Sequence, residues 1–310
     1  MRKCLIHIVC VALIVALSSH SSASDAEPGG RIKVFVSIVP QAYFVERIGG
    51  PHVEVKVLVG PGMDVHTFEP SPRTVTDLAK ARILFRIGLP YEDVLVAKIG
   101  STFKNLEVVD TRRGIPLRET EEGEEAHGHG EASHNAKEAD HHGKGEKDPH
   151  IWLAPRLVKI QAENMCRALQ RIDPARAEEY AKNLGAFLAD LDTLDAELSQ
   201  ALAPVRGKTF FVFHSAFGYF ADAYGLKQEA VETGGKEPSA RRLAKLITQA
   251  KEDGVRVIFV QPQFSQKSSE ALASAIGGAV VPVDDLARDY LANMKSIAEK
   301  VRTALSKQAK

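Results

Sequence analysis

Short runs rich in valine, isoleucine and phenylalanine alternate with helical segments along most of this chain. Such runs are typical of buried β-strands, and strands that alternate with helices are usually joined into a mostly parallel sheet. The predicted strands of the first half are 32–39, 53–59, 83–87 and 106–109. Those of the second half are 209–213, 229–232, 255–260 and 279–283. The pattern therefore predicts an α/β fold whose βα units form two groups.

A long amphipathic segment separates these two groups. Its apolar residues recur at spacings of three and four, the period of one face of an α-helix; they are Tyr180, Leu184, Phe187, Leu191, Leu194, Leu198 and Leu202. A helix over 175–202 would be roughly 40 Å long, at least the length of a small domain. It could be an ordinary helix within one domain, but its length and mid-chain position favour a spine between two lobes. The predicted division is an N-terminal lobe at 31–173, a linking helix at 174–203 and a C-terminal lobe at 204–310.

The N-terminus has the features of a secretory signal peptide. Two basic residues precede an apolar run at 4–17, and small residues follow at 21–23. The run is shorter than the roughly 20 residues that cross a bilayer as a helix, which argues against a membrane anchor. We therefore expect residues 1–23 to be cleaved off and the mature protein to be exported to the periplasm. Cys166 is then the one remaining cysteine, so we expect no internal disulfide.

The charge of the chain is balanced overall but uneven along the sequence. The 40 basic and 40 acidic residues cancel, so nothing indicates nucleic acid or a membrane surface as a partner. Residues 119–142, in contrast, contain eight carboxylates and five histidines, which are His127, His129, His134, His141 and His142. Because a segment this polar cannot pack into a core, we expect 119–147 to form a surface loop inserted in the N-terminal lobe.

Histidine-rich segments of low complexity are typical of metal binding. Imidazole and carboxylate ligands together suit divalent metals such as Zn²⁺. The hypothesis is that this loop collects Zn²⁺ at low affinity and passes it to a tighter site. The alternative is a solvated acidic loop whose histidines bind nothing.

Three further candidate ligands follow predicted strands. His66 and His214 come after the strands 53–59 and 209–213, and Asp284 comes after 279–283. In open α/β sheets ligands bind beyond the carboxyl ends of the strands, so these side chains lie where such a fold places its sites. A lone histidine at such a position is more often a structural hydrogen-bonding group than a ligand. Asp284 is ambiguous, because Asp285 beside it could serve instead, and either could cap the following helix.

Several segments resemble the motifs of one family, the metal-binding solute-binding proteins of ABC transporters. Its three histidine motifs resemble the segments Gly62–Ser71, Asp148–Leu153 and Phe213–Phe220, in that order. Gln261–Ser265 and Val283-Asp284 are similar to its later landmarks. The match spans nearly all of the mature chain. The histidine-rich insertion just before the second motif resembles the zinc-specific branch, the ZnuA type.

The resemblance implies a fold, a function and a set of ligands. The family has two α/β lobes of parallel-sheet βα units, bridged by one long helix, with the metal in the cleft between them. Its members deliver metal to a membrane permease and are not enzymes. The implied Zn²⁺ ligands are His66, His150 and His214, with Asp284 at a position that supplies a carboxylate in many members. The expected partners are an ABC-transporter permease and, in addition, a periplasmic zinc chaperone, and the protein is expected to be a monomer.

The alternatives concern the metal and its use. Manganese-binding and iron-binding homologues share the resemblance, but manganese binders pair two histidines with two carboxylates, and a third imidazole from His214 favours zinc. A zinc buffer or metallochaperone would use the same ligands, so the sequence does not separate it. A secreted zinc hydrolase would need an open position on the metal and a base such as Glu69 beside His66. The chain has no His-Glu-x-x-His sequence, which argues against that enzyme class.

Overall fold

A computed structural model of the chain describes residues 30–100, 102–120, 147–232, 238–264 and 267–307. The predicted signal peptide and the five loop histidines lie outside these residues. Residues Arg31–Lys310 form one compact unit. No helix among the described residues is long and apolar enough to cross a membrane.

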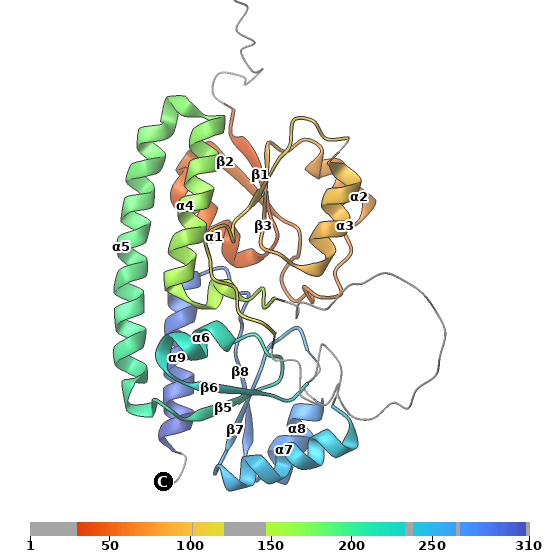
Figure 1. Cartoon of the computed structure of the whole chain (residues 1–310), viewed down its shortest axis with the longest axis vertical. Helices are drawn as coiled ribbons and strands as arrows, with labels where there is room; N and C mark the ends of the chain where they lie inside the picture. Colours follow the sequence, from red (N-terminus) through yellow and green to blue (C-terminus); the bar gives the residue numbers. More distant parts are fainter. Residues whose placement is uncertain (1–29, 101, 121–146, 233–237, 265–266, 308–310) are drawn as a thin grey trace, which may run out of the picture. The chain divides into compact units, whose positions relative to one another are not determined.

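The described strands form two parallel sheets with the same internal order (Figure 1). The first sheet has the order β2-β1-β3-β4 and contains β1 (Ile32–Val36), β2 (Val53–Val57), β3 (Ile83–Arg86) and β4 (Glu107–Asp110). The second has the order β6-β5-β7-β8 and contains β5 (Thr209–Val212), β6 (Lys227–Ala230), β7 (Val257–Val260) and β8 (Ala279–Pro282). In each sheet the chain reverses its direction of winding after the second strand. Ligands of α/β proteins bind at this switch, beyond the carboxyl ends of the strands.

Helices cover both faces of each sheet, as parallel sheets require. They are α1 (Val39–Gly49), α2 (Pro72–Leu78), α3 (Pro90–Ile99), α4 (Pro155–Ile172), α5 (Ala177–Leu202), α6 (Gly218–Tyr224), α7 (Ala240–Glu252), α8 (Lys267–Ala275) and α9 (Tyr290–Ser306). Proline in the first turn begins α2, α3 and α4, where its missing N–H costs no hydrogen bond. Serine or aspartate side chains cap the first turns of α2, α7 and α9.

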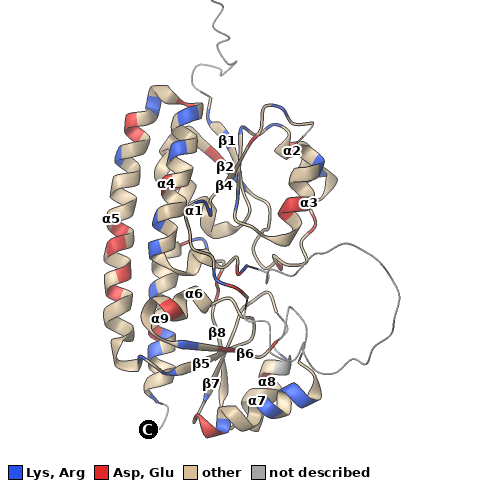
Figure 2. Ribbon diagram, in the orientation of Figure 1, with Lys and Arg blue, Asp and Glu red and all other residues tan. Residues whose placement is uncertain are grey.

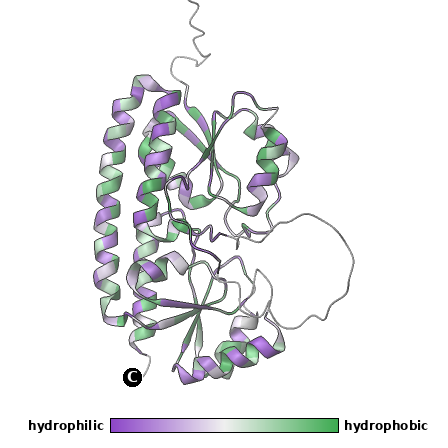
Figure 3. Cartoon of the chain, in the orientation of Figure 1, coloured by the Kyte–Doolittle hydropathy of each residue, from purple (hydrophilic) through white to green (hydrophobic). Residues whose placement is uncertain are grey.

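Alternation along β5 shows how the second sheet is packed on two faces. Phe210 and Val212 belong to a large core that also includes the first sheet and buried residues of α4, α5 and α9. Phe211 belongs to a separate core with residues of α7 and α8. Successive side chains of a strand point to opposite faces, so one strand supplies both cores. Figure 3 shows the apolar residues gathered on the sheets and on the helix faces turned toward them.

The long helix α5 joins the two halves, as predicted for the spine. Its apolar face packs on α1 and α4 of the first half and on α9 of the second half. The predicted apolar positions are buried except Leu184, which is half-buried. Ion pairs add to this packing, among them Arg47–Asp190 at 2.6 Å and Lys295–Glu197 at 2.6 Å. The ribbon of α5 carries both acidic and basic residues along its length (Figure 2). The α/β class and the connecting helix are confirmed, whereas the lobe boundaries at 173 and 204 stay predictions.

One predicted strand is displaced. The sequence pattern favoured 229–232, but β6 is Lys227–Ala230 and pairs with β5 from Thr209↔Lys227 to Val212↔Ala230. Because β6 lies at the edge of its sheet, polar residues such as Lys227 are tolerated in it, and hydrophobicity marks its start poorly. The shift matters for the site, because it leaves Glu232 in the loop beyond the strand.

Candidate metal centre

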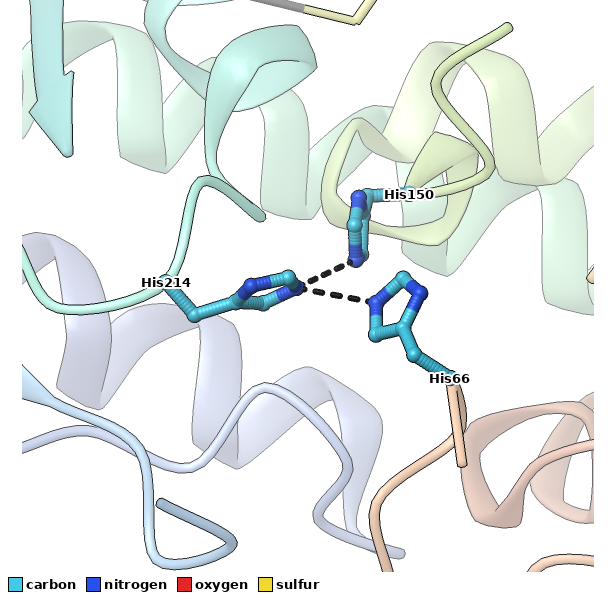
Figure 4. A group of neighbouring side chains, drawn as sticks. All are labelled: His66, His150 and His214. Carbon is cyan, nitrogen blue, oxygen red and sulfur yellow. Dashed lines mark hydrogen bonds between the residues drawn. The ribbon is translucent and has the colours of Figure 1, made fainter. Parts of the chain in front are cut away.

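Three loops bring His66, His150 and His214 together (Figure 4). His66 lies in the long loop between β2 and α2, and Asp64 Oδ1 accepts a hydrogen bond from its backbone N–H at 2.9 Å. His150 directly precedes the short 3₁₀ helix Ile151–Leu153. His214 follows β5 at the carboxyl edge of the second sheet. His150 is 3% exposed and His214 is 5% exposed, whereas His66 is half-buried.

The three imidazoles face one another through their Nε2 atoms. His214 Nε2 lies 3.0 Å from His66 Nε2 and 3.2 Å from His150 Nε2. Zinc binds imidazole nitrogen at about 2.0–2.1 Å, and a tetrahedral angle then places two such nitrogens about 3.3–3.4 Å apart. The observed spacings are close to this value. One ion of this size, bound to all three nitrogens, fits the arrangement.

Buried carboxylates fix the tautomers of two of these histidines. His150 Nδ1 lies 2.7 Å from Asp148 Oδ1, and His214 Nδ1 is hydrogen-bonded to Glu232 Oε1. A carboxylate accepts, so each Nδ1–H donates and each Nε2 keeps its lone pair for a metal. Lone pairs that face each other at such distances repel, and a cation between them removes the repulsion. The chemistry of the cluster is therefore that of a cation site.

The sheet register explains how Glu232 reaches His214. Val212 pairs with Ala230, and Glu232 N donates to Phe213 O at 3.0 Å just beyond the strand ends. The next side chain after Phe213 therefore lies beside Glu232. Glu232 was not predicted from the sequence, although it follows β6 just as His214 follows β5. Applying the strand-end rule to acidic residues as well as histidines would have found it.

The electrostatic environment keeps His66 neutral. Burial lowers the pKa of His66 to about 3, and repulsion from positive charge on His150 and His214 adds to the effect. An imidazole with this pKa carries no proton on its free lone pair near neutral pH. His66 is therefore ready to bind a metal without first losing a proton.

The fourth predicted ligand, Asp284, is engaged elsewhere. Its Oδ1 accepts a hydrogen bond from Leu286 N at 2.8 Å, and its carbonyl accepts one from Asn293 Nδ2 at 2.6 Å. Neither Asp284 nor its neighbour Asp285 belongs to the three-histidine cluster that the described residues form. These contacts are those of a residue that shapes the turn after β8. The cap of α9 is Asp289, so the helix-capping role that the sequence left open is not the one observed for Asp284.

Its neighbour Asp285 is the better candidate. Asp285 is 5% exposed, and its Oδ1 has no hydrogen-bond partner among the described residues. Burial raises its pKa, and positive charge on His214 and His150 acts in the opposite direction. A buried carboxylate oxygen without a partner costs free energy unless something binds it. A metal held by the nearby histidines would supply that partner.

Aromatic and amide side chains enclose the cluster. The Trp152 ring lies 5.1 Å from that of His150, and the Phe264 ring lies 4.7 Å from that of His214. Gln261 holds the backbone of His214 on both sides, accepting from its N at 3.3 Å and donating to its O at 3.0 Å. Around His66, in contrast, there is open space, because a cavity of about 480 Å³ begins at this residue and extends between the His66 loop and α3.

The chain has two parallel sheets of the same strand order and one helix that bridges them. Together with three converging imidazoles that could hold one divalent metal ion, this is the architecture of a two-lobed binding protein. Comparison with known proteins gives the family. Residues 34–304 match the model of the ZnuA family, described as "Zinc-uptake complex component A periplasmic", and the chain belongs to this family.

Relatives of known name agree with this assignment. The chain is 33% identical over 273 residues to the "High-affinity zinc uptake system protein ZnuA" of Bacillus subtilis (strain 168), covering 86% of this chain and 83% of that protein. It is 30% identical over 276 residues to the "Zinc-binding lipoprotein AdcA" of Streptococcus pneumoniae (strain ATCC BAA-255 / R6), with 86% of this chain and 51% of that protein covered. The likeness to AdcA is thus confined to about half of the longer protein.

Solved structures show the same fold. A crystal structure of ZnuA superposes with a TM-score of 0.79 at 40% identity and covers 89% of this chain and 99% of its own. A zinc-bound deletion mutant of ZnuA gives a TM-score of 0.79 at 39% identity, with 90% of this chain and 100% of that chain covered.

Proposed function

We propose that this protein binds one Zn²⁺ ion with His66, His150 and His214 and delivers it to the membrane permease of an ABC transporter. The observation that carries the binding step is the convergence of three Nε2 atoms at spacings of 3.0 and 3.2 Å. Nitrogen-rich ligand sets favour zinc over the harder ions manganese and magnesium. Delivery rests on membership of the ZnuA family and on relatives that are named as zinc uptake proteins.

Asp285 is the proposed fourth ligand. Its buried Oδ1 lacks a partner among the described residues, and it follows the same sheet edge as His214. With three imidazoles and this carboxylate the metal would be four-coordinate, the geometry of closed zinc sites. No position would then remain for a reactive water, and we propose that the protein has no hydrolytic activity.

The binding step is tested with the purified mature protein, titrated with Zn²⁺ in competition with a chromophoric chelator. The single tryptophan, Trp152, lies beside His150, so its fluorescence reports on the site directly. We expect one tight ion per chain in the wild type, and binding weaker by orders of magnitude in His214→Ala. His52→Ala is the control, since His52 lies at the surface beside Glu179, 3.0 Å away. Equal affinity in wild type and His214→Ala would refute the assigned site.

The delivery step needs a test in cells, in a strain that lacks its own copy and grows in the presence of a zinc chelator. Export, periplasmic location and a permease partner are part of this proposal. We expect the wild type and His52→Ala to restore growth, and His214→Ala not to do so. If the wild type restores growth equally in a strain without the permease, the protein is a zinc buffer and not a transport component.

The histidine-rich loop is proposed as a second, weaker zinc site. Its ends are held together, because Glu119 and Lys147 form an antiparallel bridge and Lys147 Nζ donates to Glu119 Oε1 at 3.0 Å. Replacing 121–146 by a short Gly-Ser linker keeps this base intact. Calorimetric titration should then lose weak zinc binding and retain the tight site. Unchanged stoichiometry would mean that the loop histidines bind no zinc.

A further inference from the structure

The three histidines are held to very different degrees. The rings of His150 and His214 each donate Nδ1–H to a buried carboxylate, from Asp148 and Glu232 respectively. Among the described residues, no side chain is hydrogen-bonded to Nδ1 of His66, and its ring is partly exposed. Charge-assisted hydrogen bonds are about twice as strong as neutral ones. Two of the rings are therefore fixed in orientation, and the third is not.

The segment that carries His150 is also hydrogen-bonded to the second half of the chain, which carries His214. Trp152 Nε1 donates to Asp285 O at 2.7 Å, and Tyr290 OH donates to Trp152 O at 2.8 Å. Tyr219 OH, from α6, donates to Asp148 O at 3.1 Å. The segment with His150 is thus hydrogen-bonded to residues of the second half of the chain, in addition to its packing on α4. His150 and His214 form one rigid half of the site.

The segment that carries His66 has few such bonds. Residues 58–71 contain neither helix nor strand. Gly62 adopts a φ of +75°, which other residues rarely take, and the Met63 beside it is 46% exposed. The bonds within this segment that involve His66 or its neighbours are local, from His66 N and Thr67 Oγ1 to Asp64. Val65 and Phe68, on either side of His66, are buried in the core and hold the loop backbone, so the His66 side chain is the part of this segment that is held least.

Space for movement lies directly beside this loop. The cavity of about 480 Å³ begins at His66 and is lined by apolar residues that include Phe68, Val75, Val94 and Leu95. Cavities of roughly 300–1,000 Å³ hold whole small molecules, so this one has room for an imidazole ring. A neutral imidazole can enter apolar surroundings at far lower cost than a charged one.

We propose that His66 is the exchangeable ligand of the site: zinc enters and leaves as the His66 imidazole detaches from the ion and moves into the adjacent cavity, while His150 and His214 stay in place. The inference rests on the proposed zinc-binding function. It specifies which bond between the protein and the zinc ion breaks first. Release begins with rupture of the bond between His66 Nε2 and the metal, and the ion remains for a short time on the other two histidines.

The first test compares single-ligand variants in zinc competition titrations. We expect His66→Ala to keep a one-to-one zinc complex on the rigid half of the site. We expect His150→Ala and His214→Ala to bind zinc at least roughly tenfold more weakly than His66→Ala, because each loses a ring that a carboxylate holds in place. If His66→Ala is as weak as His214→Ala while the wild type binds one zinc, the inference is wrong and the proposed function stands. If the wild type binds no zinc, the proposed function itself fails.

The second test fills the cavity and measures release of zinc into excess chelator by stopped flow. Val94 is 58% exposed on α3 and lines the cavity, so Val94→Phe adds bulk there without burying a new group in the core. Ala97→Phe is the matched control, on an exposed position of the same helix outside the cavity. We expect release to slow several-fold in Val94→Phe and to be unchanged in Ala97→Phe. Circular dichroism confirms that both variants fold. An unchanged or faster release rate in Val94→Phe would overturn the proposal.

Discussion

Glu232 offers the most direct test of how the protein holds the three clustered histidines. The carboxylate is buried, it accepts the Nδ1–H of His214, and this imidazole lies at the centre of the cluster. Carboxylates that orient a metal-binding histidine typically contribute 10–100-fold to metal affinity. That range corresponds to about 1.4–2.7 kcal/mol of binding free energy. Because Glu232 is 4% exposed, water cannot replace its hydrogen bond, and the loss should lie in the upper part of the range.

Two substitutions separate charge from hydrogen bonding. Glu232→Gln keeps the size and can still offer an oxygen to Nδ1–H, but the neutral bond is roughly half as strong, and we expect about 10-fold weaker zinc binding. Glu232→Ala removes the acceptor altogether and frees the ring to rotate or to take the other tautomer. For this variant we expect about 100-fold weaker binding.

The assay is a competition titration against a zinc chelator near pH 7.5, with Trp152 fluorescence as the readout. Glu229→Gln is the control, because Glu229 lies on β6 and is paired with Arg242 at 3.1 Å. It makes the same chemical change three residues away, and we expect its zinc affinity to stay within about twofold of the wild type. Wild-type affinity in Glu232→Ala would refute the reasoning. So would an equal loss in Glu229→Gln.

Three further predictions concern Asp285, Glu92 and His66. Asp285→Ala should weaken zinc binding in calorimetry by more than tenfold, and Asp284→Ala by less, because Asp284 is already bonded to Leu286 N. Glu92 is buried and accepts hydrogen bonds from Ser37 and from the backbone N–H groups after β3, so Glu92→Ala should lower the free energy of unfolding by about 3–5 kcal/mol in urea without changing zinc stoichiometry. The pKa of His66 is lowered to about 3 in the folded protein. Without metal, and at a pH between about 3 and 6.5, this imidazole is therefore protonated in the unfolded chain but not in the folded one. Its contribution to stability is present above about pH 6.5 and is lost as the pH falls toward 3, so the wild type without metal should lose about 2 kcal/mol more than His66→Gln between pH 7.5 and 5.

The parts of the site that the sequence revealed are those that obey a rule of topology. Parallel strands end at a common edge, so histidines placed after 53–59 and 209–213 could be expected to meet without knowledge of a single contact. His150 follows no strand, so the strand-end rule did not place it, and its role as a ligand was implied by the resemblance. Its place in the structure is set by hydrogen bonds of Trp152 and Tyr219 with residues far away in the chain, which no local pattern encodes.

The roles of Asp285 and Glu232 were not predicted, because each depends on where a strand or turn ends to within one or two residues. Asp284 and Asp285 are adjacent and chemically identical, yet one carboxylate caps a turn and the other is buried without a partner. Glu232 was taken for the end of a strand, and only the register between β5 and β6 places it beside His214. Sequence patterns fix the type of an element better than its exact ends, and the roles of side chains at strand ends change with a shift of one residue.

A transport protein must hold a scarce ion tightly and yet release it on demand, and one loosely held ligand reconciles these needs. Ions steered by charge associate at about 10⁸ M⁻¹s⁻¹, so a site with a Kd of about 1 nM keeps its ion for about 10 s. If loss of one ligand weakens binding about 10³-fold, the lifetime falls to about 10 ms without any change in the rest of the site. A partner that draws His66 away from the metal would therefore trigger release by moving one loop. Carboxylates bonded to His150 and His214, rather than to the ion, leave the rest of the site ready for the next ion.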